Sequence, residues 1–438
     1  MQNIENTQKK SNMQKVALTA LAGTSIEWYD FFLYGAAAAL IFPTAFFGEM
    51  PPTTALLLSL LTFAAGFIAR PIGGIIFGHF GDKVGRKKTL ISALMLMGIS
   101  STLIGLLPTY AMIGVAAPIL LTTLRFAQGL AIGGQWGGAM LLVTESAPSD
   151  QRGYYGAFAQ AGAPIGVILA NLALIITSAL VSEEFFNTWG WRIPFLASAV
   201  LILISMYIQL NLEDTDAFKA LVDNKDAQSD ENIKKSPVVE AIRKYPKRIF
   251  LAAGAFLSVQ VTFYILIAFM LAYGVTSANM ARDDMLGAVL IASAIMVPVQ
   301  FIFSSYSDRH GRKGIFMSGA VLTGIWAFAI FPLVDTGNFY LIVLAITGGL
   351  VFLAMMYGPQ AAFFTELFST EVRYSGATLG YQFGAIVGGA FAPTIAVKLW
   401  TEFDIIWVSA YIALASLLTL LSVMALTETY QSDLNNTD

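Results

Sequence analysis

Residues 338–364 read NFYLIVLAITGGLVFLAMMYGPQAAFF and carry no charged side chain. A helix needs about 20 apolar residues to cross the hydrocarbon core of a bilayer, so this stretch is long enough to span a membrane. Similar blocks recur along the chain, and we predict twelve spans, near residues 18–43, 55–78, 89–108, 114–143, 154–181, 192–212, 248–275, 285–304, 314–333, 338–364, 374–399 and 404–427. A transmembrane β-barrel would instead show alternating strands of about ten residues. The blocks therefore predict an all-α integral membrane protein.

Composition argues against a soluble protein and against most kinds of metal site. Of the 438 residues, 56% are hydrophobic and 12% are charged, about half the charged share of soluble proteins. A soluble fold would leave large apolar patches exposed. The chain has no cysteine and two histidines, so we expect no disulfide, no metal centre and no cofactor. Residues 1–15 are polar, which argues against a cleaved signal peptide.

The distribution of basic residues predicts the orientation in the membrane. Alternate loops between the predicted spans lie on the side of the N-terminus, and these loops hold most of the 25 Lys and Arg residues. Arg192, Arg282 and Lys398 lie on or near the other side. Cytoplasmic loops carry an excess of Lys and Arg. We therefore expect both termini in the cytoplasm, in a multi-pass protein of a bacterial inner membrane.

The chain is predicted to consist of two related halves. GDKVGRK at 81–87 follows the second predicted span, and SDRHGRK at 307–313 follows the eighth. Transporters built from repeats bind their substrate near the midplane, between halves that rock against each other. The predicted parts are a cytoplasmic tail at 1–17, six-helix bundles at 18–212 and 248–427, a cytoplasmic linker at 213–247 and a second cytoplasmic tail at 428–438.

Several motifs resemble those of a known family. GHFGDKVGRK at 78–87 resembles the signature loop of the major facilitator superfamily, and RFAQG at 125–129 resembles its fourth-helix motif. More specific stretches are EWYDF at 27–31, GGQWGG at 133–138, GWRIPF at 190–195 and EVRYSG at 371–376. Together they resemble the metabolite:proton symporter family, which includes shikimate, α-ketoglutarate and proline/betaine transporters. The resemblance implies the major facilitator fold of two six-helix bundles and proton-coupled transport. Gln135 departs from the pattern, because glutamate is expected there, and the change removes a titratable group.

Four charged side chains lie within the predicted spans. A charge in the bilayer costs at least about 2.5 kcal/mol on insertion scales, so it usually faces a cavity or a partner. Glu27 and Asp30 are three residues apart and share a helix face, while Arg70 and Arg125 lie in the second and fourth spans. On a functional interpretation, Asp30 or Glu27 carries a proton and the arginines bind an anionic group, with Arg125 the stronger candidate. On a structural interpretation, the four residues form fixed ion pairs between helices.

Polar and aromatic side chains within the spans are further candidates for a substrate site. Buried amides and phenols orient polar ligands, but they also form hydrogen bonds between helices, and both interpretations stay open. The candidates are Gln128, Gln135, Trp136, Tyr264, Tyr357, Gln360, Tyr381 and Gln382. Glycines spaced by four residues are expected to let helices approach closely, and they occur at Gly129, Gly133 and Gly137, at Gly162 and Gly166, and at Gly384 and Gly388.

Charged residues at the ends of the spans are candidates for gating contacts, and they repeat in the two halves. They are Asp82, Arg86, Glu145 and Arg152 in the first half and Asp308, Arg312, Glu366 and Arg373 in the second. The family resemblance implies that Asp82 meets a helix N-terminus of the opposite half, where the helix dipole favours a carboxylate. It also implies a pair between Arg86 and Glu145. We expect the second set to do the same, so that the two sets form a latch on the cytoplasmic side.

We expect a secondary transporter that imports a small organic acid or zwitterion together with protons. Two alternatives stay open, a proton-driven antiporter that exports an anionic drug or metabolite, and a transporter-like sensor that binds its ligand without moving it. An enzyme is not expected, because the chain shows no phosphate-binding glycine loop with its lysine, no metal-ligand cluster and no nucleophile elbow. The expected partners are the substrate, protons and the lipid bilayer, with no nucleic acid, and we expect a monomer.

Overall fold

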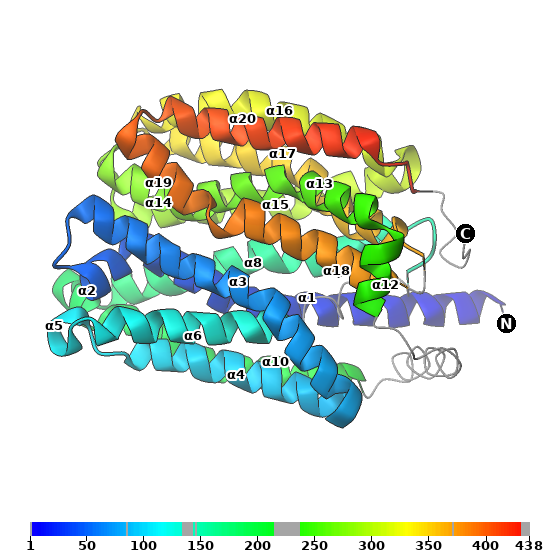
Figure 1. The fold of residues 1–438 in the computed structure, drawn as a ribbon, viewed down its shortest axis with the longest axis horizontal. Coiled ribbons are helices and arrows are strands. Elements are labelled where there is room, and N and C mark those ends of the chain that lie inside the picture. Colours follow the sequence, from blue (N-terminus) through cyan, green and yellow to red (C-terminus); the bar gives the residue numbers. More distant parts are fainter. Residues whose placement is uncertain are drawn as a thin grey trace.

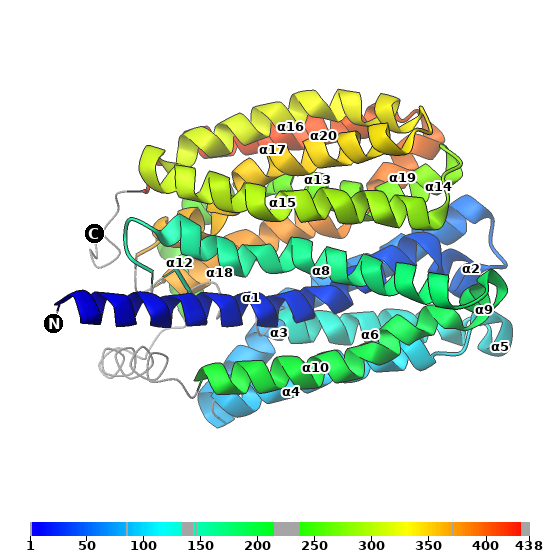
Figure 2. The ribbon, with the colours of Figure 1, turned by 180° about the vertical axis from the view of Figure 1, so that it is seen from behind.

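Long helices run side by side in two bundles in the computed structural model (Figures 1 and 2). The structure describes residues 2–84, 86–133, 143–144, 147–213, 237–369 and 372–430. Within these ranges it describes the backbone alone at residues 2–12, 78–84, 86–87, 90, 208–213, 237–239 and 374. Every regular element among the described residues is a helix, as the apolar blocks predict.

Six long helices form the first bundle, in the lower part of Figure 1. They are α1 (Gln2–Leu40), α3 (Pro52–Val84), α4 (Arg86–Leu106), α6 (Ala116–Gly133), α8 (Arg152–Leu180) and α10 (Ile193–Glu213). Short elements join them at one end: α2 (Phe42–Phe47), α5 (Tyr110–Ile113), α9 (Glu183–Thr188) and the 3₁₀ turn η1 (Gly190–Arg192).

The second bundle repeats this pattern with six further spans, two of which contain a π-helical segment. The first span consists of α13 (Pro246–Tyr264), η2 (Ile265–Phe269) and α14 (Met270–Thr276), and the fifth of α18 (Arg373–Gly384), η3 (Ala385–Ala390) and α19 (Ala392–Glu402). The others are α15 (Arg282–His310), α16 (Arg312–Val334), α17 (Phe339–Glu366) and α20 (Ile406–Ala425). π-Helical segments are rare and often lie at functional sites.

The predicted fold of two six-helix bundles is confirmed. In the described ranges, ten spans are long and apolar enough to cross a membrane. The other two are α1, whose apolar part is interrupted by Glu27 and Asp30, and α4, whose apolar run is shorter (Ile91–Leu106). Several helices extend past the predicted blocks, because hydropathy marks the membrane core while backbone hydrogen bonding continues into the polar ends.

Two local features fall within segments that we expected to be linker or tail. The amphipathic helix α12 (Pro237–Lys244) occupies the end of the predicted linker and lies against α18 and α13. Residues 426–430, after α20, pack onto the second bundle through Glu428 and Thr429. The rest of the linker, 214–236, and residues 431–438 lie outside the described part of the chain.

The start of the first helix and the end of α20 distinguish the two ends of the bundles. α1 begins and α20 ends at the same end of the helices (Figure 1), which we call the terminal side, and the opposite end is the distal side. α8 and α16 begin on the terminal side, and α15 ends there, because successive spans alternate in direction.

Glycines allow close contacts inside each bundle. A Cβ atom on Gly129 would overlap the carbonyl oxygen of Gly66, and one on Gly133 would overlap that of Arg70, so α6 and α3 touch through their backbones. Gly162 and Gly166 face Thr24 and Trp28 of α1 in the same way, and Gly384 and Gly388 face α13. The predicted glycine contacts thus join helices of the same half; Gly137 lies outside the described residues.

The two bundles meet mainly along α8 and α15, which run side by side in Figure 2. Buried amide side chains donate to backbone carbonyls across this seam. Gln300 Nε2 donates to Ala157 O at 3.2 Å, and Asn171 Nδ2 donates to Leu286 O at 3.1 Å. Gln160 Nε2 also crosses the interface, to Tyr357 O of α17 at 3.2 Å. Hydrogen bonds of this kind hold the halves together without fixed charges.

Candidate functional site

Asp30 lies in the interior of the first bundle. Its side chain is 1% exposed, and the Ser198 hydroxyl of α10 donates a hydrogen bond to Asp30 Oδ1. The neighbouring residue Tyr29 donates to Pro194 O at 2.8 Å, so two of the family-like stretches, EWYDF and GWRIPF, contact each other. Glu27, the other predicted proton carrier, is partly exposed. The structure therefore gives the two carboxylates different surroundings.

A chain of polar side chains links Asp30 to Arg125. Arg125 Nη1 donates to Gln128 Oε1 at 3.0 Å, and Gln128 Nε2 donates to Ser101 Oγ at 2.7 Å. Ser101 in turn lies within hydrogen-bonding reach of the Asp30 carboxylate, and Arg125 is close enough to interact with that carboxylate electrostatically. Three helices, α1, α4 and α6, thus contribute to one buried polar path.

Aromatic rings enclose Arg125 on its other sides. The guanidinium carbon lies 4.1 Å from the ring centre of Phe31, 4.3 Å from that of Tyr34 and 4.7 Å from that of Phe63. Ring faces attract cations at such distances. Among the described residues, Nε and Nη2 of Arg125 have no hydrogen-bond partner. A buried arginine held this way is satisfied by π faces and a remote carboxylate rather than by a direct ion pair.

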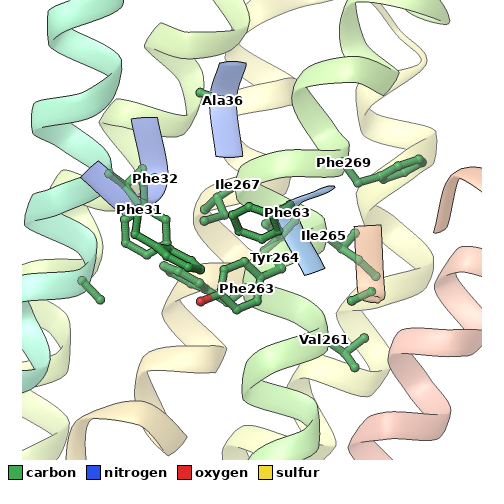
Figure 3. Close-up of a cluster of buried hydrophobic side chains, with 14 of the residues drawn as sticks. Phe31, Phe32, Ala36, Phe63, Val261, Phe263, Tyr264, Ile265, Ile267 and Phe269 are labelled. Carbon is green, nitrogen blue, oxygen red and sulfur yellow. The ribbon is translucent and has the colours of Figure 1, made fainter. Parts of the chain in front are cut away.

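Arg70 occupies a different place, where the two bundles meet. Its guanidinium carbon lies 4.4 Å from the ring centres of both Phe31 and Phe67, and 5.4 Å from that of Trp28. The hydroxyl of Tyr264, from the second bundle, is within its hydrogen-bonding reach. Figure 3 shows Phe31 and Phe32 of α1, Phe63 of α3 and Tyr264 of α13 converging at this point. Arg70 is 1% exposed, and its Nε and Nη2 have no hydrogen-bond partner in the described ranges.

A small cavity lies between the halves beside this cluster. It is lined by Trp28 and Phe32 of α1 and by residues of the second bundle: Phe256, Val259, Gln260, Phe263, Tyr264, Leu353, Tyr357 and Tyr381. Its volume is about 10 Å³, space for about one water molecule. Tyr357 and Tyr381 are also close enough to Arg70 for an electrostatic interaction. Three phenols of the second half therefore lie within electrostatic range of one arginine of the first.

The remaining predicted substrate residues divide into three groups. Gln360 and Gln382 are buried in the second bundle, and within the described structure their Oε1 atoms have no hydrogen-bond partner. Gln128 belongs to the path between Arg125 and Asp30. Gln135 and Trp136 lie outside the described residues. No group of three or more His, Asp or Glu side chains among the described residues could hold a metal ion.

The predicted contacts at the terminal side are formed by the second set of charged residues. Asp308 accepts hydrogen bonds from the backbone N–H groups of Gly153 and Tyr154, each at 2.8 Å, at the start of α8 in the other half. Arg312 Nη1 lies 2.6 Å from Asp308 Oδ1, and Arg312 Nη2 lies 3.2 Å from Glu366 Oε1. The structure thus joins a carboxylate of one half to a helix N-terminus of the other, where unpaired N–H groups and the helix dipole favour an anion.

The structure describes the other candidates for gating only in part. Arg152 is buried and close enough to Glu366 for a charge interaction. Arg373 is buried as well, and its Nε donates to Phe368 O at 3.3 Å. Glu145 and the side chains of Asp82 and Arg86 lie outside the described part of the chain.

Sequence reasoning missed several residues that the structure brings to these sites. Ser101 and Ser198 contact Asp30, but serines are common in membrane helices and give no signal on their own. Gln260 lines the cavity, and its Nε2 has no partner among the described residues; an amide in an otherwise apolar span was a usable signal. On the distal side, Arg282 Nη2 donates to Ser178 Oγ of the other half at 2.9 Å, and its guanidinium carbon lies 4.0 Å from the Phe186 ring centre.

Comparison with known proteins identifies the family. The family model described as Major Facilitator Superfamily matches residues 20–379. The inner membrane metabolite transport protein YhjE of Escherichia coli (strain K12) is 39% identical over 431 residues, 97% of this chain and 96% of the relative. The shikimate transporter of the same strain is 37% identical, over 94% of this chain and 93% of its own.

A more distant relative and a solved structure agree with this result. The proline/betaine transporter of Escherichia coli (strain K12) is 33% identical over 91% of this chain and 80% of its own. The crystal structure of a D-xylose-proton symporter superposes with a TM-score of 0.73 at 17% identity, covering 96% of this chain and 99% of the other, which supports the fold. The chain therefore belongs to the Major Facilitator Superfamily, among its metabolite transporters.

Proposed function

We propose that this transporter is a symporter, which moves a small organic acid or zwitterion together with protons by alternating access. The observation that carries the proposal is the buried path from Asp30 through Ser101 and Gln128 to Arg125, one aromatic ring away from a second arginine at the interface of the halves. An intramembrane carboxylate and two intramembrane arginines are expensive, and such residues usually mark substrate or proton pathways.

Asp30 is the proposed proton carrier. It is the buried carboxylate of the α1 pair, and Ser198 and Ser101 surround it with groups that can orient a protonated or a charged carboxyl. A carboxyl group favours its neutral form when it loses solvent and its charged form beside an arginine. Rocking of the bundle can therefore load and release a proton by changing the access of water to Asp30 and its distance from Arg125.

Arg70 is the proposed anchor for a carboxylate of the substrate. It lies between the halves, and two of its nitrogen atoms have no hydrogen-bond partner in the described structure. Tyr264 of the second bundle is within its hydrogen-bonding reach, and Tyr357 and Tyr381 are within its electrostatic range. A planar guanidinium holds a carboxylate bidentately. The aromatic walls of the cavity suit the apolar body of a small ring or a methylated ammonium group. The names of two relatives, the shikimate transporter and the proline/betaine transporter, supply the first probes.

Phe31 supplies the proposed link between the two sites. Its ring centre lies 4.1 Å from the guanidinium carbon of Arg125 and 4.4 Å from that of Arg70. Arg70 and Arg125 together already outweigh the one Asp30 carboxylate. Protonation of Asp30 enlarges this positive excess, and an anionic substrate at Arg70 reduces it. Proton and substrate would thus favour each other's binding.

The terminal side is proposed to be the cytoplasmic side of a bacterial inner membrane. Described basic residues on this side include Lys15, Lys88, Arg243, Lys247 and Arg309. An excess of Lys and Arg in the short loops of one side is the usual mark of the cytoplasmic face. The contact of Asp308 with α8 then closes the inward path, and the contact of Arg282 with Ser178 closes the outward path.

Reconstituted vesicles with an imposed pH gradient test the proposal. We expect uptake of radiolabelled shikimate, betaine or proline when the outside is acidic, and loss of this accumulation in the variant Asp30→Asn. The same variant should still exchange labelled for unlabelled substrate, because binding at Arg70 is retained. Glu27→Gln is the matched control and should keep acid-driven uptake.

Three outcomes would count against the proposal. Extrusion against the acid gradient would indicate an antiporter, and saturable binding without flux would indicate a sensor. Unchanged acid-driven accumulation by Asp30→Asn would remove Asp30 from the coupling site.

A further inference from the structure

Residues 426–430 pack onto the charged cluster at the terminal side of the second bundle. The carboxylate of Glu428 accepts hydrogen bonds from the backbone N–H groups of Arg312 and Lys313, each at 2.9 Å. These are the first two residues of α16, and the residue before them, Gly311 (φ 99°), has no side chain to cap the helix. A carboxylate at this point meets unpaired N–H groups and the positive end of the helix dipole. Glu428, which follows α20 in the chain, therefore caps the N-terminus of α16.

The capping is reciprocal, because a side chain of α16 also caps the C-terminus of α20. Lys313 Nζ donates to Met424 O at 3.0 Å and to Leu426 O at 2.7 Å. The last carbonyls of a helix have no partner within the helix, and a cation there is favoured by the dipole. The start of α16 and the end of α20 are thus fixed to each other by two charged side chains.

Thr429 connects this segment to the ion pairs. Its side chain is buried, and its hydroxyl donates to Glu366 Oε2 at 2.7 Å. Arg312 holds the same carboxylate through Nε at 3.3 Å and Nη2 at 3.2 Å, and its third nitrogen, Nη1, lies 2.6 Å from Asp308 Oδ1. Arg312 is therefore shared between Glu366, inside its own half, and Asp308, which faces the other half.

We propose that Glu428 and Thr429 are positioning residues for the contact that closes the terminal side. Thr429 supplies one of the donors that the buried Glu366 carboxylate requires, and Glu428 fixes the backbone from which Arg312 projects. Without them, Glu366 draws the Arg312 guanidinium toward itself, and Asp308 loses its cation while still accepting from Gly153 and Tyr154. A buried charge that loses a partner destabilises the arrangement that contains it.

We call the hydrogen bonds made by Glu428 and Thr429 the brace. The brace stabilises one conformation rather than the fold as a whole. The hydrogen bonds that Glu428 and Thr429 form with Arg312, Lys313 and Glu366 join parts of the second bundle, so they can persist while the halves move. The contact of Asp308 with α8 crosses between the halves, so it must break when the terminal side opens. Weakening the brace therefore shifts the balance between conformations toward the one that is open on the terminal side. This inference goes beyond the proposed function and holds whatever the substrate is.

Thiol labelling tests the inference directly, because the chain has no cysteine of its own. A157C places a thiol in the buried terminal part of the α8–α15 seam, and L286C places one in its buried distal part; both residues contribute only a backbone carbonyl to the seam hydrogen bonds. In Thr429→Val and in Glu428→Gln we expect faster maleimide labelling at position 157, by up to roughly tenfold, the effect of losing one hydrogen bond to a charged group from a single conformation. Labelling at position 286 should not rise. Thr429→Ser keeps the hydroxyl and should restore the slow rate.

Controls separate this shift between conformations from a general destabilisation of the fold. Glu402→Gln removes a carboxylate from an exposed pair with Lys398 and should leave both labelling rates unchanged. Faster labelling at both reporter positions would mean that the segment only stabilises the fold, and an unchanged rate at position 157 would overturn the inference. If Glu428→Gln does not fold, Thr429→Val, which keeps the cap of α16, decides the question.

Discussion

The two buried arginines of the first bundle have different surroundings. Arg125 is held by Gln128 and three aromatic rings inside the bundle, and it is within electrostatic range of Tyr264 in the opposite half. Arg70 is nearer, within hydrogen-bonding reach of the Tyr264 hydroxyl. Because substrates of this fold bind between the halves, the second position is the better one for a ligand group. Arg125 then serves to hold the charge balance around Asp30.

Lysine substitutions should separate the two roles. Arg70→Lys keeps the charge but loses the planar fork, so we expect the KM for a carboxylate substrate to rise by about tenfold or more, the scale of one charge-assisted hydrogen bond. Arg125→Lys should change KM little and lower acid-driven accumulation. The concentration dependence of uptake, measured with and without a pH gradient, checks both expectations. A large rise of KM in Arg125→Lys, with a normal KM in Arg70→Lys, would reverse the assignment.

At the scale of single residues, the sequence identified the charged side chains within the spans but could not predict where each of them lies. Glu27 and Asp30 share a helix face, but Asp30 is buried and Glu27 is partly exposed. The difference arises because residues of α10 and α4 pack against Asp30. The sequence also favoured Arg125, on its motif, over Arg70. The rotation of α3 that turns Arg70 toward the second bundle is set by packing, which no local pattern encodes.

At the scale of elements, glycines fix how α3 and α6 pair. Positions 73, 129 and 133 bring the two backbones into contact, with Gly73 against Leu130 O and Gly133 against Arg70 O. A methyl group at these points has no space and meets backbone rather than a side chain that could turn away. Adding atoms to a tightly packed site forces the backbone to shift and typically costs about 1–3 kcal/mol.

We therefore expect Gly73→Ala and Gly133→Ala to lower the midpoint of thermal unfolding in detergent. Gly287→Ala, in α15, is the matched control, because a Cβ atom there meets nothing within 4 Å. Alanine is the better helix former by about 1 kcal/mol, so the control should unfold at the same or a higher temperature. Equal midpoints for all three variants and the parent chain would mean that α3 and α6 can separate freely.

The elements themselves were predicted well, for a physical reason. Backbone groups in a bilayer must be satisfied internally, so an apolar block of sufficient length has to be a helix. The sequence could not predict the π-helical segments η2 and η3, or the helix α12, because these depend on packing and on polar surroundings. The contact of Asp308 with the start of α8 was expected from the family resemblance, and its partners in residues 426–430 were not.

At the scale of the whole molecule, the halves are joined at both ends. Asp308 contacts α8 on the terminal side, and Arg282 contacts Ser178, Asn187 and Phe186 on the distal side. Asp283 strengthens the distal contact, since its Oδ2 accepts from Ser178 Oγ at 2.6 Å. Together these contacts describe an arrangement in which the halves touch at both ends and from which either side can open.

Removing the distal contact should favour the conformation that is open on the distal side, whereas removing the brace should favour the one that is open on the terminal side. We expect Arg282→Ala to increase maleimide labelling of L286C, whose backbone carbonyl accepts from Asn171 in the distal seam, and to leave labelling of A157C equal or slower. Lys398→Ala, on the distal surface of the second bundle, is the control for loss of a positive charge. Faster labelling of A157C in Arg282→Ala would show that Arg282 does not act on one side alone.

The glycine contact between α3 and α6 has a consequence for the electric field inside the protein. Arg70 and Arg125 project from these two helices, whose backbones are in contact, and their guanidinium groups are further confined by the shared ring of Phe31. Moving the two positive charges apart to relax their repulsion in a medium of low polarisability would therefore break this packing. A negative charge brought close to them relaxes the repulsion without that loss, and the first bundle carries this preference for an anion with it wherever it moves.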